Sequence, residues 1–329
     1  MIPEQEEPVF ESRTDLTVLS EAVSRIKAEL GKIIVGQTQM VDQLIAAILS
    51  NGHVLIEGVP GVAKTLTAKL LARSIEIPFS RIQFTPDLMP SDVLGTSVFN
   101  PRDNGFEFRP GPIFSGVVLI DEINRSPAKT QSALFEVMEE RQVTVDGHSH
   151  PMHKPFMVVA TQNPVEHEGT YRLPEAQLDR FLFKINVPYP DLEEEINILK
   201  GHHTMVDGTA LDAIEKVLNS EQIIFLQQLI RSLHMEEKLF RFIAELVTST
   251  RKNKSIFLGA SPRATIAVMN AAKSIATMQG RDFVTPEDII YVLPPVLRHR
   301  LILTPEKEME GITTDDVIRQ IIQSAEIPR

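Results

Sequence analysis

The sequence predicts a parallel α/β domain followed by an all-helical domain. Between residues 35 and 190, short apolar runs alternate with segments whose apolar residues recur at helical spacing. Strands separated by helices form a parallel sheet that is covered on both faces. After Pro190 only helical patterns follow. We therefore expect a mobile acidic tail at 1–11, an α/β domain at 12–190 and a helical domain at 191–329.

Local patterns place the individual elements. An amphipathic helix is expected over 16–30, because Leu19, Val23, Ile26 and Leu30 recur at helical spacing. Strands are expected at 53–57, 81–85, 117–120, 156–161 and 184–187. Helices are expected between them at 65–74 and 127–139, and after them at 192–201, 220–233, 236–250, 262–278 and 286–292.

Composition limits the class of protein. The 329 residues are 43% hydrophobic and carry a formal net charge of −11, which argues against broad affinity for nucleic acid. The absence of cysteine excludes disulfides and thiolate metal sites, and it fits a cytoplasmic location. The start MIPEQEEPVF has no apolar core, so no signal peptide is predicted. No apolar stretch reaches the roughly 18 residues of a membrane helix, so no membrane insertion is expected.

The segment GVPGVAKT, from Gly58 to Thr65, has the pattern of a phosphate-binding loop. It follows an apolar strand and opens a helix, so its backbone N–H groups and the helix dipole would face phosphate oxygens. Lys64 is expected to add a positive charge there, and the Thr65 hydroxyl is expected to be a ligand for Mg²⁺. Ala63 stands where a glycine is usual, which reduces backbone freedom; the alternative is a structural glycine-rich turn. The residues expected to contact nucleotide here are Gly58, Val59, Pro60, Gly61, Val62, Ala63, Lys64, Thr65 and Leu66.

The segment VVLIDEINR presents two carboxylates after a buried strand. In open α/β sheets ligands bind outside the carboxyl ends of the strands. Asp121 is expected there as a Mg²⁺ ligand, and Glu122 as the base that accepts a proton from attacking water. The alternative for Asp121 is a cap on the following turn.

The segment VVATQNP is a third apolar run that ends in polar residues. Asn163 is expected to orient the attacking water and to sense the γ-phosphate. An Asn-Pro pair also commonly starts a turn, so the prediction depends on the order of the motifs.

Two arginines complete the set of candidate catalytic residues. Arg180 lies in LPEAQLDRF at the end of a short helix, from which it would reach a neighbouring subunit's γ-phosphate. The alternative is a surface ion pair with Asp179 or Glu175. Arg263 lies in GASPRAT, in the first turn of a helix, and would act as a second nucleotide sensor; the alternative is a solvated arginine.

In their order along the chain, these segments resemble the AAA+ ATPases. Val35, Gly36 and Gln37 form VGQ, where that superfamily places its adenine-contacting segment. Finer matches resemble the MoxR family: GVPGVAKT, DEINRSPAKTQSALFEVMEERQVTVDG, ATQNPVEHEGTYRLPEAQLDRFLF and GASPRA, together spanning about 35–300. The resemblance implies an AAA+ P-loop domain with a helical lid, and ATP and Mg²⁺ as cofactors. It also implies a β-hairpin before the acidic strand, around 95–112 with a turn at 103–105.

The resemblance also implies partners. Such proteins form homo-oligomeric rings, usually hexamers, and work beside proteins with von Willebrand factor A domains. Their expected function is chaperone-like remodelling or maturation of client proteins, and this sequence does not encode the client. Three alternatives remain: a nucleic-acid motor of helicase or branch-migration type, a magnesium-chelatase-like ATPase subunit, and a scaffold that binds ATP but scarcely hydrolyses it.

Overall fold

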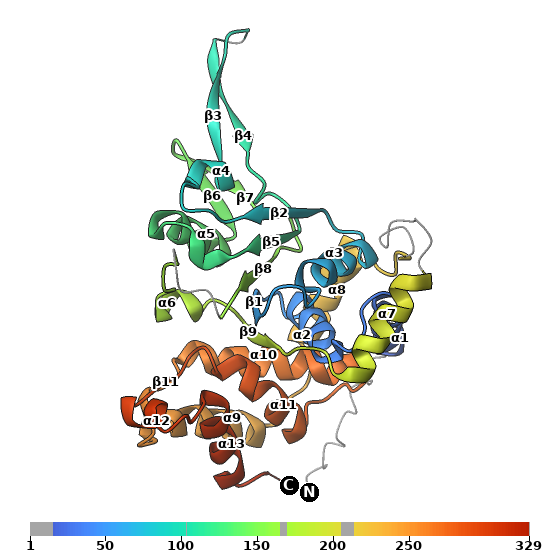
Figure 1. Ribbon diagram of the computed structural model, residues 1–329, viewed down its shortest axis with the longest axis vertical. Helices are drawn as coiled ribbons and strands as arrows, with labels where there is room; N and C mark the ends of the chain where they lie inside the picture. Colours follow the sequence, from blue (N-terminus) through green and yellow to red (C-terminus); the bar gives the residue numbers. More distant parts are fainter. Residues whose placement is uncertain (1–15, 103, 165–169, 205–213, 329) are drawn as a thin grey trace, which may run out of the picture.

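A five-stranded parallel sheet forms the centre of the protein (Figure 1). The computed structural model describes residues 16–102, 104–164, 170–204 and 214–328, so the acidic tail expected at 1–11 lies outside the described residues. The strands follow the order β2-β5-β8-β1-β9. All five predicted strands are confirmed, with ends that shift by one or two residues: β1 (Val54–Gly58), β2 (Phe79–Gln83), β5 (Val117–Asp121), β8 (Met157–Gln162) and β9 (Phe183–Val187).

Alternate residues of these strands enter two different hydrophobic clusters. Val54 and Ile56 of β1 face one cluster, whereas Leu55 faces the other. Because both faces of a parallel sheet are covered by helices, such strands are apolar nearly throughout. Helices and one short 3₁₀ helix complete the α/β domain: α1 (Thr17–Gly31), α2 (Thr38–Leu49), α3 (Lys64–Ser74), α4 (Pro90–Leu94), η1 (Ile123–Arg125), α5 (Ala128–Glu140) and α6 (Glu175–Leu178).

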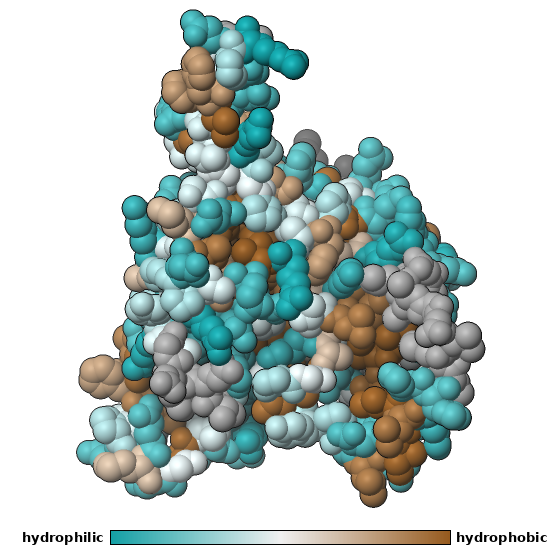
Figure 2. All heavy atoms as spheres, turned by 45° about the horizontal axis from the view of Figure 1, so that its top comes forward, coloured by the Kyte–Doolittle hydropathy of each residue, from teal (hydrophilic) through white to brown (hydrophobic). Residues whose placement is uncertain are grey.

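Two hairpins extend the α/β domain beyond its sheet. The expected hairpin is confirmed as β3 (Gly95–Asn100) paired with β4 (Gly105–Pro110), and it projects at the top of Figure 1. Figure 2 shows apolar atoms on this projection, where Phe106 is 77% exposed and Phe99 48%. The second hairpin pairs β6 (Gln142–Val145) with β7 (His148–Pro151).

The C-terminal part is predominantly helical, as predicted. The last strand of the sheet ends at Val187 and the next helix begins at Leu192, and we propose the domain boundary in this interval. A short antiparallel ladder of β10 (Ile256–Leu258) and β11 (Ile302–Leu303) is an addition that the helical patterns did not predict. The helices are α7 (Leu192–Thr204), α8 (Ser220–Arg231), α9 (Glu237–Lys252), α10 (Pro262–Met278), α11 (Pro286–Leu297), α12 (Pro305–Met309) and α13 (Thr314–Ser324).

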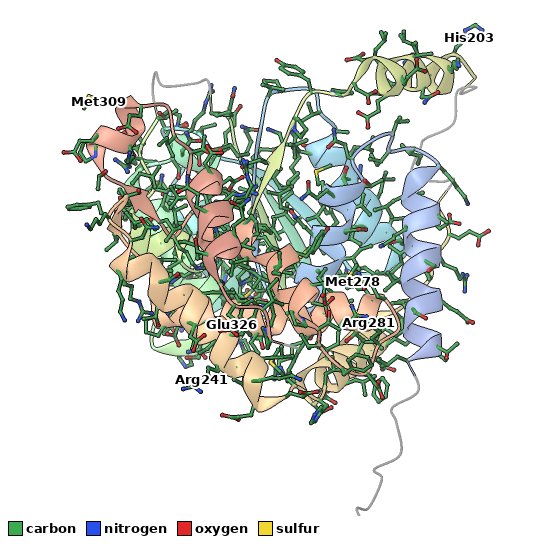
Figure 3. The ribbon with its side chains drawn as sticks, turned by 90° about the horizontal axis from the view of Figure 1, so that it is seen from below. His203, Arg241, Met278, Arg281, Met309 and Glu326 are labelled. Atoms are coloured by element: carbon green, nitrogen blue, oxygen red, sulfur yellow. The ribbon has the colours of Figure 1, made fainter. Side chains whose placement is uncertain are left out.

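The helical domain packs on α1 and α2, below the sheet in Figure 1. Buried residues of α2, α8 and α10 belong to one cluster with one face of the sheet. The Gln227 amide donates to the Ile48 carbonyl oxygen at 2.6 Å, and the hydroxyls of Ser50 and Ser274 lie 2.7 Å apart. In the view from below, His203 at the end of α7 and Met309 of α12 lie on opposite sides of the molecule (Figure 3). No helix within the described residues is long and apolar enough to cross a membrane.

A buried histidine connects the sheet to α5. Nδ1 of His53 accepts the Val158 N–H at 2.9 Å, which leaves Nε2 to donate to the Met138 carbonyl at 3.1 Å. Burial lowers the pKa of His53 well below 6.5, and the charge of Arg141 lowers this pKa further. The folded protein therefore holds this imidazole neutral.

Because the folded state resists protonation that the unfolded chain accepts near pH 6.5, His53 contributes its full stability above that pH. We expect the free energy of unfolding to fall as the pH drops from 7.5 to 5.5, and His53 contributes up to about 1.4 kcal/mol per pH unit to this fall below pH 6.5. Substitution His53→Gln should flatten this dependence in urea titrations, leaving the share of buried His299, whose pKa is also lowered by burial. Exposed His148→Gln is the control. An equal pH dependence in all three proteins would contradict this origin.

Candidate active site

The predicted phosphate-binding loop connects the carboxyl end of β1 to α3, as its motif requires. A Cβ on Gly58 would lie 2.9 Å from the Val187 carbonyl oxygen, so the loop starts pressed against β9. Gly61 has a φ of 89° and Ala63 a φ of 59°, both in the left-handed region. That region costs an alanine about 1–2 kcal/mol. The usual glycine would fit at position 63 without this cost, so the loop is formed but strained.

Lys64 begins α3 and folds back along the loop. Its Nζ donates to the Gly58 carbonyl at 2.5 Å. Burial lowers the pKa of Lys64, whereas the charges of Asp121, Glu122 and Glu57 act in the opposite direction. A half-buried ammonium group is thus set among carboxylates at one edge of the sheet, and its positive charge suits phosphate oxygens there.

Asp121 and Glu122 lie at the same edge, at the end of β5. The Thr161 hydroxyl of β8 donates to Oδ1 of Asp121 at 3.2 Å, and it accepts the Glu122 N–H at 3.1 Å. Glu122 has a φ of 57°, so the chain turns sharply between the two acids. The oxygens of Asp121 and of the Thr65 hydroxyl are of the type that Mg²⁺ prefers, and that ion usually takes few protein ligands together with nucleotide phosphates. These residues therefore fit a magnesium–nucleotide complex.

Three polar partners of the acids come from β2 and η1, and the sequence did not predict them. Arg81 Nε lies 2.6 Å from Oδ2 of Asp121. The Gln83 amide donates to Oε2 of Glu122 at 2.8 Å, and Arg125 Nε lies 3.2 Å from the same oxygen. Arg81 and Gln83 are two residues apart on β2, so they share one face of the strand. The register of β2 against β5 puts Gln83 opposite Asp121. The polar residues at alternate positions of β2 were the feature of the sequence that could have indicated these contacts.

The remaining predicted residues of this edge have less defined surroundings. Asn163 follows β8 directly, between the loop strand and the acidic strand, and it is partly exposed. Gln37 is buried, and Val35 and Gly36 lie on the connection between α1 and α2. Gly36 has a φ of 77°, and a Cβ there would lie 2.2 Å from the Glu194 carboxylate of α7. The positive φ favours glycine at this position, where the Glu194 side chain of α7 lies against the connection.

Arg180 and Arg263 lie at the opposite edge of the sheet, near the amino ends of the strands. Both pair with Glu139 in the last turn of α5: Arg180 Nε is 3.2 Å from Oε2, and Arg263 Nη2 is 2.8 Å from Oε1. Arg180 is thus in an ion pair, as its alternative interpretation held, but the partner is Glu139, whereas Asp179 pairs with Arg300 and Glu175 with Arg172. The two arginines are therefore brought together, and they are separated from the subunit's own loop by the length of the sheet.

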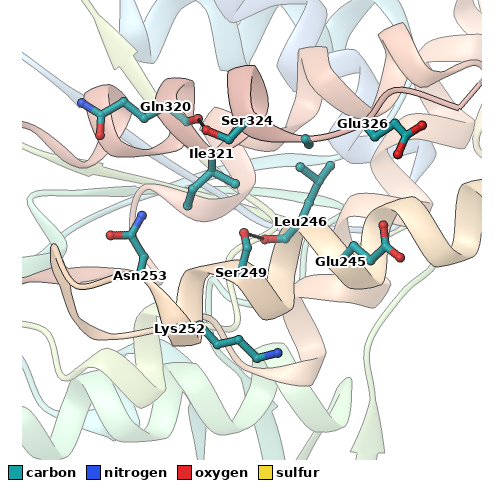
Figure 4. Close-up of a pocket in the computed structure, with 10 residues that line it drawn as sticks. Glu245, Leu246, Ser249, Lys252, Asn253, Gln320, Ile321, Ser324 and Glu326 are labelled. Atoms are coloured by element: carbon teal, nitrogen blue, oxygen red, sulfur yellow. Dashed lines mark hydrogen bonds between the residues drawn. The ribbon is translucent and has the colours of Figure 1, made fainter.

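Two surface cavities differ in whether predicted site residues line them. One of about 510 Å³ opens between α9 and α13, and it is lined by none of the described candidate residues (Figure 4). Another of about 280 Å³ is lined by Glu139, Asp179, Arg180, Arg263 and Arg300, among others. The chemistry inferred from the sequence therefore lies at the sheet edges and outside the cavity of Figure 4.

A phosphate-binding loop after β1, two acids at the end of β5 and polar residues at the end of β8 between them define a P-loop nucleotide-binding protein. Residues 53–183 match the ATPase family associated with various cellular activities (AAA), and residues 248–321 match the AAA lid domain. Chaperone MoxR1 of Mycobacterium tuberculosis is 45% identical over 92% of this chain and 81% of its own length. The chain belongs to the MoxR family of AAA+ ATPases.

Two further relatives cover nearly the whole chain. The uncharacterized protein YeaC of Bacillus subtilis is 47% identical over 94% of this chain and 95% of its own length. A solved structure from Cytophaga hutchinsonii is similar with a TM-score of 0.88, at 41% identity, over 95% of this chain and 97% of that chain. The similarity therefore extends across both the α/β domain and the helical domain.

The strained conformation of Ala63 gives a stability prediction. Ala63→Gly should raise the free energy of unfolding by about 1 kcal/mol, because glycine adopts a positive φ without the steric cost. Exposed Ala28 in the middle of α1 is the matched control, where the same change should lower stability by about 1 kcal/mol. Urea unfolding measures both. Destabilisation by Ala63→Gly of the size seen at Ala28 would contradict the left-handed conformation.

Proposed function

We propose that the protein hydrolyses ATP in a homo-oligomeric ring and uses the energy released for chaperone-like remodelling or maturation of client proteins. The observation that carries this proposal is the division of candidate groups between the two sheet edges. The loop lysine and both acids lie at one edge, and the paired arginines lie at the other. Each subunit thus presents one part of a site on each side, and a ring would join complementary parts.

The roles at the loop edge follow from side-chain chemistry. Lys64 would bind the β- and γ-phosphates, and Thr65 and Asp121 would hold Mg²⁺, which screens phosphate charge when bound. Glu122 would take a proton from the attacking water. Asn163 would orient that water. The contacts of Gln83 and Arg125 would hold the Glu122 carboxylate in place.

The arginines would serve a neighbouring subunit. β1 has five residues, so its two ends are about 13–17 Å apart, and the arginines lie beyond its amino end. That separation exceeds the reach of one arginine side chain to its own loop. A guanidinium is planar and keeps its charge, which suits the oxygens of a γ-phosphate in transfer. Arg180 and Arg263 would therefore act together on the nucleotide of the next subunit.

The remaining proposals concern the adenine contacts, the partners and the location of the protein. Val35, Gly36 and Gln37 would contact adenine, with α7 closing over them through Glu194. Membership of the MoxR family supports a ring, and we propose a hexamer that works with a partner carrying a von Willebrand factor A domain. The name of the relative Chaperone MoxR1 supports a protein client. The cysteine-free composition supports a cytoplasmic location.

Binding and hydrolysis should depend on different residues. Lys64→Ala should weaken ATP binding about 10- to 100-fold, because the ammonium contacts phosphates before reaction. Glu122→Gln should keep ATP affinity and lower turnover by about 10²–10⁴, because its proton transfer belongs to the transition state. Calorimetry and steady-state phosphate release measure the two effects. An equal loss of ATP affinity in both variants would overturn the assignment.

Mixing two inactive variants tests the action between subunits. Arg180→Ala should bind ATP normally and hydrolyse it about 10³–10⁵ times more slowly. Mixing it with Glu122→Gln should restore turnover, because an Arg180→Ala subunit keeps Glu122 and receives an intact arginine from its neighbour. ATPase rate is followed against mixing ratio, with assembly checked by light scattering. Mixed assemblies without any recovery would show that Arg180 does not act in trans.

A further inference from the structure

Arg300 follows α11 of the helical domain, and it forms several hydrogen bonds with the segment that carries Arg180. Its Nε donates to Oδ1 of Asp179 at 2.7 Å, and Nη2 donates to the carbonyl oxygens of Asp179 at 2.9 Å and Phe181 at 2.7 Å. Nη1 donates to the Leu182 carbonyl at 3.3 Å and to the Val296 carbonyl. One guanidinium thus holds the backbone carbonyls of Asp179, Phe181 and Leu182, on both sides of Arg180.

Burial makes this contact specific. The Arg300 side chain is 3% exposed and that of Asp179 is 16% exposed. A buried charge that loses its partner is strongly unfavourable, so the guanidinium and the carboxylate hold one relative position. A lysine could not replace this group, because a single ammonium lacks the planar fork that reaches several acceptors in different directions.

The same carboxylate also connects to the second arginine. Oδ2 of Asp179 accepts the Ser261 hydroxyl at 2.8 Å. Ser261 is the N-cap of α10, and its hydroxyl accepts the N–H of Arg263 at 3.2 Å. Asp179 therefore joins the Arg180 segment to the start of the helix that carries Arg263, and Glu139 joins the two guanidinium groups themselves.

We propose that Arg300 and Asp179 are positioning residues that hold Arg180 and Arg263 as one rigid unit for the neighbouring subunit's nucleotide. The inference rests on the proposed action of Arg180 in trans. Arg300 is buried and donates to the backbone of 179, 181 and 182, so it would act by keeping that segment against the helical domain. Displacement of a catalytic group by about 1 Å can lower a rate by about 10². The defect of an Arg300 variant should therefore appear in the neighbour that receives the arginines.

The experiment uses mixed rings in which the donor and acceptor of the arginines are defined. Donors carry Glu122→Gln and supply Arg180, whereas acceptors carry Arg180→Ala and hydrolyse ATP. Arg300→Lys on the donor should lower the recovered kcat at least about tenfold, with little change in KM for ATP. The same change on the acceptor should leave recovery intact, because that subunit has no Arg180 to position. A merely structural role would impair the ring in both placements.

Two further variants keep the test interpretable. Asp179→Asn on the donor keeps the side-chain shape but removes the counter-charge, so it should also reduce recovery even where Arg300→Lys fails to fold. Arg281→Lys on the donor disturbs a different ion pair of the helical domain, with Asp288, and should leave recovery unchanged. ATP affinity and ring assembly are measured for every mixture.

The possible failures are distinguishable. Absence of recovery in the parent mixture of Glu122→Gln with Arg180→Ala would refute the action in trans itself. Full recovery in the parent mixture and with donors carrying Arg300→Lys or Asp179→Asn would refute only the positioning role. Equal losses with Arg300→Lys on the donor and on the acceptor would assign Arg300 to the packing of the helical domain.

Discussion

The parallel direction of the central strands is the constraint on which the arrangement of this protein depends. Parallel strands deliver all their carboxyl ends to one edge, so residues far apart in sequence meet there. Lys64, Asp121 and Thr161 reach that edge from three strands. The connections back across the sheet deliver α5 and α6 to the other edge, where Glu139 meets Arg180. In the proposed ring, these two groups of residues would belong to sites shared between neighbouring subunits.

Backbone strain is concentrated where the strands give way to functional turns. Ala63 and Glu122 both have positive φ values, at the exits of β1 and β5. Such conformations cost about 1–3 kcal/mol each and persist only where surrounding contacts impose them. The Thr161 hydroxyl holds the N–H of Glu122, and the start of α3 follows Ala63 directly. The free energy cost of these two turns is offset by the packing of the buried core around the sheet.

Elements and motifs that depend on a short stretch of sequence could be predicted, whereas contacts between residues far apart in the chain could not. Apolar runs gave the five strands, and the loop motif and its flanking elements identified Lys64. Arg300 and Asp179 are 121 residues apart, so no window of sequence contains their contact. The contact between Gln83 and Glu122 depends on the register of β2 against β5, which the order of elements leaves open. The β10–β11 ladder has strands of three and two residues, too short for a periodic signal.

The hydrophobic cluster shared by the two domains has a mechanical consequence. Leu44 of α2, Val54 of the sheet and Val268 of α10 belong to it, and all three are fully buried. Opening the joint between the domains would bring such apolar surface into water, at about 25 cal/mol for each Å². The sheet and the helices packed on it therefore resist separation and would move together. A displacement that starts in the sheet would be passed on to α10 because this joint has little freedom to absorb it.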